Sequence, residues 1–544
     1  MKLHLITERS FMSTPINEKQ IVYDQASIYT KKLKEELTYQ LSSEVEVPVI
    51  IGGKKIFTKQ KQKIVCPHDH QHVLGHYSKA SAEEILIAQS YIANNGESSW
   101  RKMNFVDRAA VFLKAAELLS QKYRFKLNAA TMLGQSKTAI QAEIDSACEL
   151  IDFWRFNVHF MQEIYSEQNL ISPKGVWNRL EYRALEGFVL AITPFNFTAI
   201  AGNLPTAPAL MGNSVIWKPA SASMLSSYYI MEILKEAGLP DGVINMIPGD
   251  GSLIGERLLG TRELAGVHFT GSTNTFNNIW KTVGNNLVNN LYKTYPRLVG
   301  ETGGKDYVLA CADADIDALT VALIKGAFEY QGQKCSAVSR AYIPESIWRQ
   351  LINNMLARLE KLKLGDVKDF DVYMGAVIDQ KAYNNTVRYI EEVKKSTQAR
   401  IIYGGDHSDE VGYFISPTII VTDDPLYKTM QEEIFAPVLS VYVYPDHKFK
   451  ETLDVLKNTS PYALTGAIFA QDRKTINYLT SELVDTAGNF YINDKPTGAI
   501  VGQQPFGGAR LSGTNDKAGS KLNLLRWISP RSIKENFNPP TNLD

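Results

Sequence analysis

The sequence predicts an α/β protein with two sheet-containing units. Between residues 186 and 303, short apolar runs alternate with helical stretches, and a second alternation of this kind extends from 304 to about 505. Continuous apolar strands separated by helices are typical of parallel sheets covered on both faces. The length of 544 residues also exceeds what one ordinary hydrophobic core encloses, so more than one domain is expected.

Composition and charge argue against several classes of protein. Hydrophobic residues make up 44% and charged residues 21%, which is typical of a soluble globular protein. Lysine plus arginine equals aspartate plus glutamate at 58 each, so there is no basic surplus for nucleic acid. No apolar run reaches the roughly 18 residues of a membrane span. The four cysteines lie far apart, which argues against disulfides or a cysteine-based zinc site and favours a reducing compartment.

The first part of the chain is expected to be mainly helical. Residues 16–45 are polar and charged, and we expect a surface helix with an arm there. Apolar side chains then recur at helical spacing through residues 81–130, and residues 137–165 continue in the same style.

The segment 186–303 is expected to form the first sheet. Expected strands are 188–192, 214–217, 244–247, 266–270 and 297–300, and expected helices are 223–237, 253–259 and 274–289. Gly238 is the expected C-cap of the first of these helices. Dinucleotides commonly bind at the carboxyl ends of such strands. The turns that follow the strands are therefore candidate binding elements.

The segment from 304 onwards is expected to form the second sheet. It begins with a helix at 317–330, and expected strands are 338–343, 400–403, 418–422, 438–444 and 464–470. A further strand is predicted for the tail 521–535, whose apolar residues are Leu524, Leu525, Trp527 and Ile528.

Cys335 is a candidate nucleophile. It follows the helix at 317–330 on a loop of small and polar residues, Gln331-Gly-Gln-Lys-Cys-Ser336. Next to Lys334, its thiol is expected to have a lowered pKa and to react as a thiolate. A single cysteine is more often a buried structural residue, so other residues have to decide between the two interpretations.

Three further motifs stand at predicted strand ends. Residues 301–305, Glu-Thr-Gly-Gly-Lys, offer a carboxylate as general base beside two glycines that allow close backbone approach. Residues 269–272, Phe-Thr-Gly-Ser, precede a helix whose first amides can hold a phosphate. Residues 193–197, Thr-Pro-Phe-Asn-Phe, place a side-chain amide where it can donate to an oxyanion. Each motif also fits an ordinary turn when it is taken alone.

A histidine-rich stretch invites a metal interpretation. His68, His70 and His72, with His76 beyond them, have spacings that resemble metal ligands. The stretch lacks an HExxH pattern and a carboxylate triad, and it fits a hairpin. A surface hairpin is therefore the favoured interpretation, and no metal is expected.

Taken together, these motifs resemble those of the aldehyde dehydrogenase superfamily over residues 45–535. Glu301 precedes Cys335 by 34 positions, as the base and nucleophile of that superfamily usually stand. Further similar segments are Trp217-Lys-Pro219, Gly412-Tyr-Phe-Ile-Ser-Pro417, Glu432-Glu-Ile-Phe-Ala-Pro437 and Pro505-Phe-Gly-Gly508. The resemblance implies a Rossmann-like cofactor domain, an α/β catalytic domain and a β-hairpin oligomerisation arm.

Within the superfamily, the chain is most similar to the branch that oxidises L-glutamate γ-semialdehyde to L-glutamate in proline degradation. This semialdehyde is in equilibrium with 1-pyrroline-5-carboxylate. The stretch 498–516 is long and specific, and residues 194–200 and 269–276 also match. The resemblance implies an oxidoreductase that uses NAD. Ser221 stands three residues after Lys218, where NAD-preferring members often carry an acidic group, so NADP is kept as an alternative cofactor.

The resemblance implies a role for each matching residue. The implied catalytic residues are Cys335 as nucleophile, Asn196 as oxyanion donor and Glu301 as the base that activates water. The implied cofactor-binding residues are Thr193, Lys218, Gly271, Ser272, Thr273, Asn274, Thr275 and Glu433. The implied substrate-binding residues are Ser336, Gly498 and Ala499 at the α-carboxylate, with Phe197 and Phe506 along the aliphatic chain.

The same resemblance implies how the chain is divided. The dinucleotide-binding domain would comprise 46–165 and 186–303, and the catalytic domain 304–520. An N-terminal arm would occupy 1–45, and the oligomerisation arm and tail 166–185 and 521–544. Since that arm pairs with a neighbouring subunit in the family, a homodimer or higher homo-oligomer is expected, with a small-molecule substrate and neither nucleic acid nor membrane as partner.

The compartment depends on the source. Family members of eukaryotes work in the mitochondrial matrix, and a bacterial protein would be cytoplasmic. The first 15 residues are too short and weakly apolar for a secretory signal and make a poor mitochondrial leader. Met12 also leaves the start codon open.

Three other functions stay open at this point. The nearest is a dehydrogenase for another semialdehyde, such as succinic semialdehyde. A non-catalytic relative that acts as a structural or binding protein would not need intact Cys335, Glu301 and Asn196. A simple thioester hydrolase would need no dinucleotide.

Overall fold

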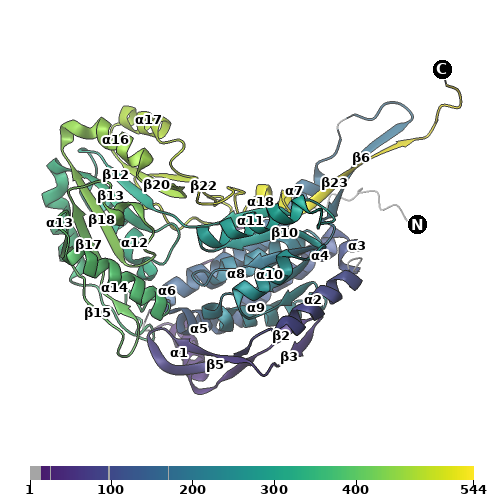
Figure 1. Cartoon of the computed structure of the whole chain (residues 1–544), viewed down its shortest axis with the longest axis horizontal. Helices are drawn as coiled ribbons and strands as arrows, with labels where there is room; N and C mark the ends of the chain where they lie inside the picture. The colour runs from purple at the N-terminus through teal and green to yellow at the C-terminus, as the bar shows by residue number, and fades with distance from the viewer. Residues whose placement is uncertain (1–13, 25, 96–98, 170, 544) are drawn as a thin grey trace.

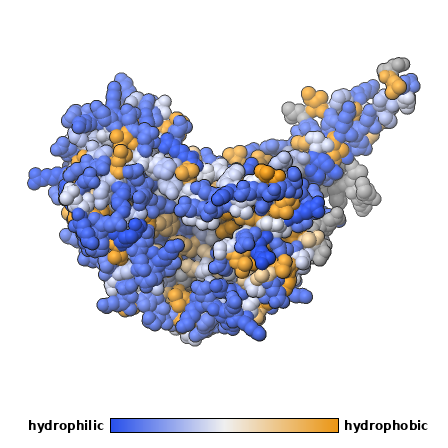
Figure 2. Space-filling model, in the orientation of Figure 1, coloured by the Kyte–Doolittle hydropathy of each residue, from blue (hydrophilic) through white to orange (hydrophobic). Residues whose placement is uncertain are grey.

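A computed structural model describes residues 14–24, 26–95, 99–169 and 171–543, and most of the segment that makes a poor leader, residues 1–13, lies outside this part. Two lobes, each built on its own sheet, lie side by side, and a two-stranded ribbon projects from one of them (Figure 1). In the space-filling view the outer surface is mostly hydrophilic, and hydrophobic patches gather towards the middle and along the ribbon (Figure 2).

The first sheet is doubly wound, as the sequence predicts. Its strands in spatial order are β11 (Arg297–Glu301), β10 (Leu264–Thr270), β7 (Phe188–Ile192), β8 (Ser214–Lys218), β9 (Ile244–Met246), β2 (Val49–Ile51) and β3 (Lys54–Ile56). The strands from β11 to β9 are parallel, and β2 and β3 extend the sheet in antiparallel pairing. The chain order reverses between β7 and β10, which is where ligands bind in such sheets.

Helices cover both faces of this sheet because its strands are apolar on both sides. Val189 and Ala191 belong to one buried cluster, while Phe188 and Leu190 belong to another. Helices around the first cluster are α4 (Phe105–Leu118), α5 (Arg124–Gln135), α7 (Glu149–Ser166), α8 (Thr198–Leu210) and α9 (Met224–Glu236). Helices around the second are α2 (Ala82–Asn95), α10 (Gly251–Leu259) and α11 (Thr273–Val288).

The second sheet repeats this construction. Its strands in order are β14 (Ala399–Tyr403), β17 (Thr418–Thr422), β18 (Val438–Tyr444), β13 (Val338–Pro344), β12 (Asp306–Ala310), β20 (Thr465–Phe469) and β21 (Asn489–Ile492). All neighbours are parallel except β14 and β17. Helices α12 (Ile316–Phe328) and α13 (Glu345–Leu359) pack on one face, and α16 (Phe449–Asn458) and α17 (Arg473–Glu482) pack on the other. The sequence predicted five of these strands and missed β12 and β21.

The N-terminal region is more tightly packed than expected. Helix α1 (Ile28–Ser42) buries Leu33 and Leu37, so it is not only a surface helix. The predicted hairpin is confirmed as β4 (Lys61–Cys66) and β5 (Asp69–Ser78). Its His68 is 2% exposed, with Nδ1 3.2 Å from the Ser136 hydroxyl. The surface position expected for this histidine is wrong, because the loop at Ser136 covers it.

The projecting ribbon pairs two segments that are far apart in sequence. Strand β6 (Val176–Ala184) and strand β23 (Ile528–Asn536) are antiparallel neighbours (Figure 1). The strand predicted for 521–535 is wrong in its first part, because α18 (Lys521–Leu525) is a helix capped by Ser520. Leu524 and Trp527 are fully buried against the first lobe. None of the helices in the described part of the chain is long and apolar enough to cross a membrane.

Candidate active site

The candidate site lies where the two sheets meet. Asn196 follows the carboxyl end of β7, and Cys335 precedes the amino end of β13. The loop 301–305 connects β11 of the first sheet to β12 of the second. The carboxyl edge of one parallel sheet is thereby joined to the amino edge of the other. The structure thus brings together the motifs that contain Asn196, Glu301 and Cys335, which the sequence places at separate strand and helix ends.

The loop before Cys335 has an unusual backbone. Tyr330, Gln331 and Gly332 all have positive φ values, at 51°, 55° and 62°. Left-handed conformations are costly for the two residues that have side chains. A side chain on Gly332 would begin 2.2 Å from the carbonyl oxygen of Ala436, so only glycine fits there.

Buried hydrogen bonds hold this strained loop in place. The Tyr330 hydroxyl donates to the Gln135 carbonyl at 2.9 Å. The Gln331 amide donates to the carbonyls of Ser136 and Ala376, at 3.0 and 2.6 Å. Because these partners lie on two other segments, the surroundings determine the loop conformation. Such a rigid support is what a nucleophile needs for repeated, accurate attack.

Asn196 is fixed to the same loop. Its side-chain amide donates to the Gln333 carbonyl at 3.0 Å, and the residue is 4% exposed. The neighbouring Phe195 carbonyl accepts from the Gln135 side chain at 2.5 Å. The segment after β7 and the loop before Cys335 therefore share Gln135 as a support, and the predicted oxyanion donor lies next to the predicted nucleophile's loop.

Glu301 ends β11 with its carboxyl group facing the segment 507–517. A side chain on Gly507 would begin 3.0 Å from Oε1 of Glu301, whereas Oε2 is buried with no hydrogen-bond partner. Burial raises the pKa of Glu301 well above its ordinary value, while Lys517 nearby lowers it in part. A carboxylate with a raised pKa and a free oxygen atom is suited to act as a general base.

The two glycines after Glu301 allow close contacts with two other site residues. A side chain on Gly303 would collide with the Glu433 carboxyl group at 2.3 Å, and one on Gly304 with the Cys335 carbonyl oxygen at 2.1 Å. The Gly304 amide also donates to Glu433 at 2.9 Å. The sequence motif at 301–305 is therefore needed for packing as well as for its carboxylate.

The expected low pKa of the Cys335 thiol is contradicted. Burial, followed by the carboxyl groups of Asp306, Glu301 and Glu433, raises its pKa well above the ordinary value. Lys334, from which the low pKa was expected, is paired with Glu329 at 3.2 Å. Cys335 is still partly exposed, whereas the other three cysteines are buried.

The predicted cofactor-binding residues lie at the carboxyl edge of the first sheet, except Glu433, which precedes β18 of the second sheet. Thr193 accepts a hydrogen bond from the Trp217 indole at 2.9 Å, which fixes the turn after β7. Lys218 ends β8 beside Gly251, and burial lowers the pKa of its ammonium group. Gly271 and Ser272 lead into α11, where Ser272 is the N-cap.

This edge fits a dinucleotide. Thr273 has a buried hydroxyl oxygen without a hydrogen-bond partner, and it lies in the first turn of α11 together with Asn274 and Thr275. Helix N-termini favour phosphate groups. Glu433 is held by the Gly304 amide and has a pKa raised to about 7 by burial. A polar group with an unused hydrogen bond, a helix N-terminus and a half-buried lysine match the groups of a nucleotide cofactor.

The predicted substrate residues come from both ends of the catalytic region. The Ser336 hydroxyl lies 2.8 Å from the Thr497 hydroxyl, next to Gly498 and Ala499. Gly498 has a φ of 86°. Phe506 pairs with Ala518 through two backbone hydrogen bonds, beside the glycine that contacts Glu301. Phe197 lies with its ring 4.4 Å from the ammonium nitrogen of Lys137.

Sequence reasoning missed several buried charges around the site. Lys137 is fully buried and pairs with Asp145, and its ammonium nitrogen also lies 3.8 Å from the Tyr330 ring centre. Lys305 is buried with no partner for its nitrogen atom, and burial lowers its pKa to about 7. Lys305 is the last residue of the motif 301–305, so the sequence could have marked it as a site residue. Nothing in the local sequence of Lys137 marks it as buried.

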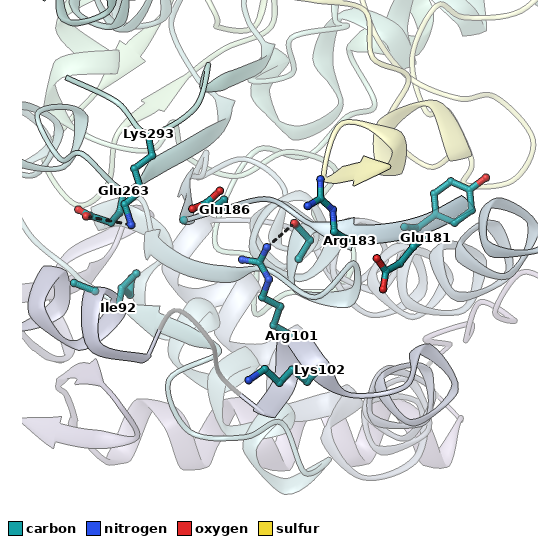
Figure 3. A pocket seen from close by; sticks show the side chains of 12 residues that line it. Ile92, Arg101, Lys102, Glu181, Arg183, Glu186, Glu263 and Lys293 are labelled. Carbon is teal, nitrogen blue, oxygen red and sulfur yellow. Dashed lines mark hydrogen bonds and ion pairs between the residues drawn. The ribbon is translucent and has the colours of Figure 1, made fainter. Parts of the chain in front are cut away.

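A cavity of about 760 Å³ lies elsewhere, at the foot of the ribbon (Figure 3). Its charged lining residues are Arg101, Lys102, Glu181, Arg183, Glu186, Glu263 and Lys293. The Arg101 guanidinium donates to the Leu185 carbonyl at 2.9 Å. Gly187, also in the lining, precedes β7, so this cavity is at the amino end of the strand whose carboxyl end carries Asn196.

Comparison with known proteins agrees with this geometry. Residues 57–533 match the model of the aldehyde dehydrogenase family. The mitochondrial delta-1-pyrroline-5-carboxylate dehydrogenase of Dictyostelium discoideum is 52% identical, over 98% of this chain and 96% of that protein. The human mitochondrial enzyme of the same name is 45% identical, over 96% and 92%.

Solved structures give the same result. The delta-pyrroline-5-carboxylate dehydrogenase of Mycobacterium tuberculosis bound with NAD has a TM-score of 0.94 and 50% identity, covering 99% of each chain. The 1-pyrroline-5-carboxylate dehydrogenase from Thermus with bound NAD has a TM-score of 0.89 and 31% identity, covering 96% of this chain and all of that one.

Proposed function

The chain belongs to the aldehyde dehydrogenase family, and from that premise we propose that it oxidises L-glutamate γ-semialdehyde to L-glutamate with NAD as hydride acceptor. The semialdehyde is the open form of 1-pyrroline-5-carboxylate, the compound in the names of the relatives. The observation that carries the proposal is the hydrogen bond from Asn196 to the loop of Cys335. It places an amide donor beside a partly exposed cysteine, between two sheets of which one is suited to a dinucleotide.

In the proposed reaction, Cys335 attacks the aldehyde carbon. Its thiol loses its proton to solvent as a carbon–sulfur bond forms. The Asn196 amide and the Cys335 backbone N–H donate hydrogen bonds to the oxyanion, in the manner of other oxyanion holes. When bound, NAD supplies the acceptor for the hydride that leaves this carbon, and a thioester of Cys335 remains.

Glu301 then activates the water that hydrolyses the thioester. It removes a proton as the water oxygen bonds to the acyl carbon, and the sulfur of Cys335 leaves as thiolate. The raised pKa of Glu301 supports this role, because a stronger base accepts the proton more readily. The unpartnered Oε2 atom supports it as well.

Most of the residues proposed to hold NAD lie at the carboxyl edge of the first sheet, and Glu433 comes from the second lobe. Thr193, Lys218 and the α11 N-terminus from Gly271 to Thr275 would bind the adenosine and phosphate portions, and Glu433 the nicotinamide ribose. NADP remains an alternative, because Ser221 offers no carboxylate to repel a 2′-phosphate.

Ser336, Gly498 and Ala499 are proposed to bind the α-carboxylate of the substrate. The hydroxyl of Ser336 and the loop backbone offer donors away from the reacting carbon, which adds binding energy and orientation. Phe197 and Phe506 would flank the aliphatic chain. These donors favour a substrate with a distant carboxylate over a simple aliphatic aldehyde.

We also propose that the ribbon of β6 and β23 pairs with a second copy of the chain, in a dimer or higher homo-oligomer. An isolated two-stranded ribbon is only marginally stable in water, so a partner would explain why it projects. We also propose the domain boundaries that the sequence predicts. If the chain is eukaryotic, the names of its relatives favour the mitochondrial matrix; otherwise the cytoplasm is proposed.

A substrate panel tests the proposed function. Wild-type protein and the Cys335→Ala variant are assayed with NAD or NADP against glutamate semialdehyde, succinic semialdehyde and a simple aliphatic aldehyde. We expect reduced cofactor to form fastest with glutamate semialdehyde, and no turnover by the variant. Faster turnover of succinic semialdehyde would favour the alternative substrate. Ester hydrolysis without any dinucleotide requirement would favour a hydrolase, and full activity of Cys335→Ala would contradict the mechanism.

A further inference from the structure

The first described residues of the chain run without helix or strand along the first lobe. We call residues 14–24 the N-terminal strap. The Glu18 carboxylate accepts from Arg124 and Arg155, both at 2.6 Å. Further along, the Ile21 amide and the Tyr23 hydroxyl donate to the buried carboxylate of Glu143, both at 2.8 Å. The strap is therefore held at several points by charged and buried partners.

One residue of the strap contacts the loop that the proposed function assigns to substrate binding. We call residues 498–504 the anchor loop. The Asn17 amide donates to the backbone carbonyl of Val501 at 2.8 Å, and the Gln503 side chain donates to the amide oxygen of Asn17 at 3.0 Å. These contacts join positions 484 and 486 residues apart.

Asn17 itself is held by helix α7. Its amide also donates to the Asp152 carboxylate at 2.8 Å, and the Glu18 backbone amide donates to the other oxygen of this carboxylate at 2.7 Å. Asp152 is 4% exposed. Asn17 thus connects a buried carboxylate of the lobe to the backbone of the anchor loop.

The far end of the anchor loop is held by apolar packing and by the polar contacts of Asn17. Val501 is 6% exposed within the core of the first lobe, and a side chain on Gly502 would begin 2.2 Å from the Phe156 ring. The near end of the loop is fixed by the contact of Thr497 with Ser336 at 2.8 Å. Gly498 and Gly502 have φ values of 86° and 82°, in the left-handed region that favours glycine. Beyond Gly498, the loop makes its own turn, in which the backbone amide of Gln503 donates to the Ile500 carbonyl at 3.0 Å.

We propose that Asn17 is a positioning residue of the substrate site, which acts by holding the anchor loop so that Gly498 and Ala499 can bind the substrate carboxylate. This inference rests on the proposed function. Asn17 is not placed in contact with the substrate, the cofactor or the reacting atoms. The N-terminal strap would therefore set the affinity for the substrate and leave the chemistry and the cofactor site unaffected.

The Asn17→Ala variant tests this proposal. Its loss of hydrogen bonds to the loop should raise KM for glutamate semialdehyde by about fivefold or more. KM for NAD and the turnover of an aldehyde without a carboxylate, such as propanal, should stay within about twofold of wild type, by the same scale of hydrogen-bond energies. Hydrogen–deuterium exchange of the backbone amides in 498–504 should be faster than in wild type.

Asn213→Ala provides the control. Asn213 is a buried asparagine, whereas Asn17 is half-buried, and it has a matching set of hydrogen bonds. Its amide donates twice, to the carbonyls of Pro208 and Trp527, and accepts once, from the Leu185 amide. It joins segments 314 residues apart, away from the anchor loop. We expect this variant to lose stability without changing the ratio of KM for glutamate semialdehyde to KM for NAD. Gln503→Ala, on an exposed side chain, should change the ratio in the same direction as Asn17→Ala but less.

These measurements test the proposed function and the positioning role of Asn17 separately. If wild-type protein does not oxidise glutamate semialdehyde, the proposed function fails, while the exchange measurement still tests the strap. If exchange in 498–504 is the same in Asn17→Ala as in wild type, the positioning role is overturned. The role is also overturned if Asn17→Ala and Asn213→Ala change all three kinetic constants alike.

Discussion

The side-chain amide of Asn196 donates to the backbone carbonyl of Gln333 at 3.0 Å, two residues before Cys335. Asn196 belongs to the carboxyl edge of the first sheet, and Gln333 to the amino edge of the second. Since a buried carbonyl group holds this amide, its orientation is fixed before substrate arrives. A preorganised donor costs no reorganisation at the moment of reaction.

Replacement of Asn196 by alanine should therefore slow the chemical step. We expect kcat to fall by about 10²- to 10³-fold, the usual effect of removing one oxyanion donor. Binding of NAD, measured by titration of the intrinsic fluorescence, should be unchanged. Asn157→Ala removes a similarly buried asparagine that donates to Asn203 at 2.9 Å, and it should leave kcat close to that of wild type. Equal losses of kcat in both variants would show that only packing is affected.

Glu301→Gln should separate the two halves of the reaction. Glutamine keeps the size of the side chain but cannot accept the proton of water, so hydrolysis of the thioester should slow by at least about 10²-fold. We expect a rapid burst of one NADH per active site, followed by a slow steady state, in stopped-flow absorbance measurements. Cys335→Ala should give no burst. A slow first turnover without a burst would mean that Glu301 is needed mainly before hydride transfer.

The thiol of Cys335 should react more readily as the pH rises. Burial and the carboxyl groups of Asp306, Glu301 and Glu433 raise its pKa, so the thiol is protonated at neutral pH. Below that pKa, the thiolate fraction and the alkylation rate increase by about tenfold for each pH unit. Iodoacetamide labelling of the protein without cofactor, followed by peptide mass spectrometry between pH 6 and 9, measures this rate. A rate that is already constant from pH 6 upwards would contradict the raised pKa.

The order of strands and helices was largely predictable because the local sequence determines it. Strands such as β7 are buried on both faces, so they stand out as continuous apolar runs. The motifs with Asn196, Glu301 and Cys335 were also found, since turns at strand ends need small and polar residues.

The charge state of the site could not be read from the sequence. Asp306 and Glu433 face Cys335 only through the folding of separate strands, whereas Lys334, its neighbour in sequence, is paired with Glu329. The contact of Asn17 with the anchor loop could not be predicted for a similar reason. A hydrogen bond between residues hundreds of positions apart leaves no periodic pattern in the sequence. The start of the tail was wrongly assigned, since its buried apolar residues fit a short helix as well as a strand.

Gly304 is predicted to be essential for packing the site. A methyl group there would begin 2.1 Å from the Cys335 carbonyl oxygen and 2.4 Å from the Asp306 carboxylate, and neither the backbone oxygen nor the buried strand start can move freely. Overpacking of this kind typically costs about 1–3 kcal/mol. Gly304→Ala should therefore lower the free energy of unfolding by that amount, measured by urea denaturation, and should displace Cys335 enough to remove most dehydrogenase activity.

Gly255→Ala offers the opposite case, because this glycine lies within α10 and nothing stands within 4 Å of the added methyl group. Alanine is favoured over glycine inside a helix by about 1 kcal/mol, so this variant should be slightly more stable and fully active. If Gly304→Ala were as stable and active as Gly255→Ala, the loop 301–305 would not constrain the position of Cys335.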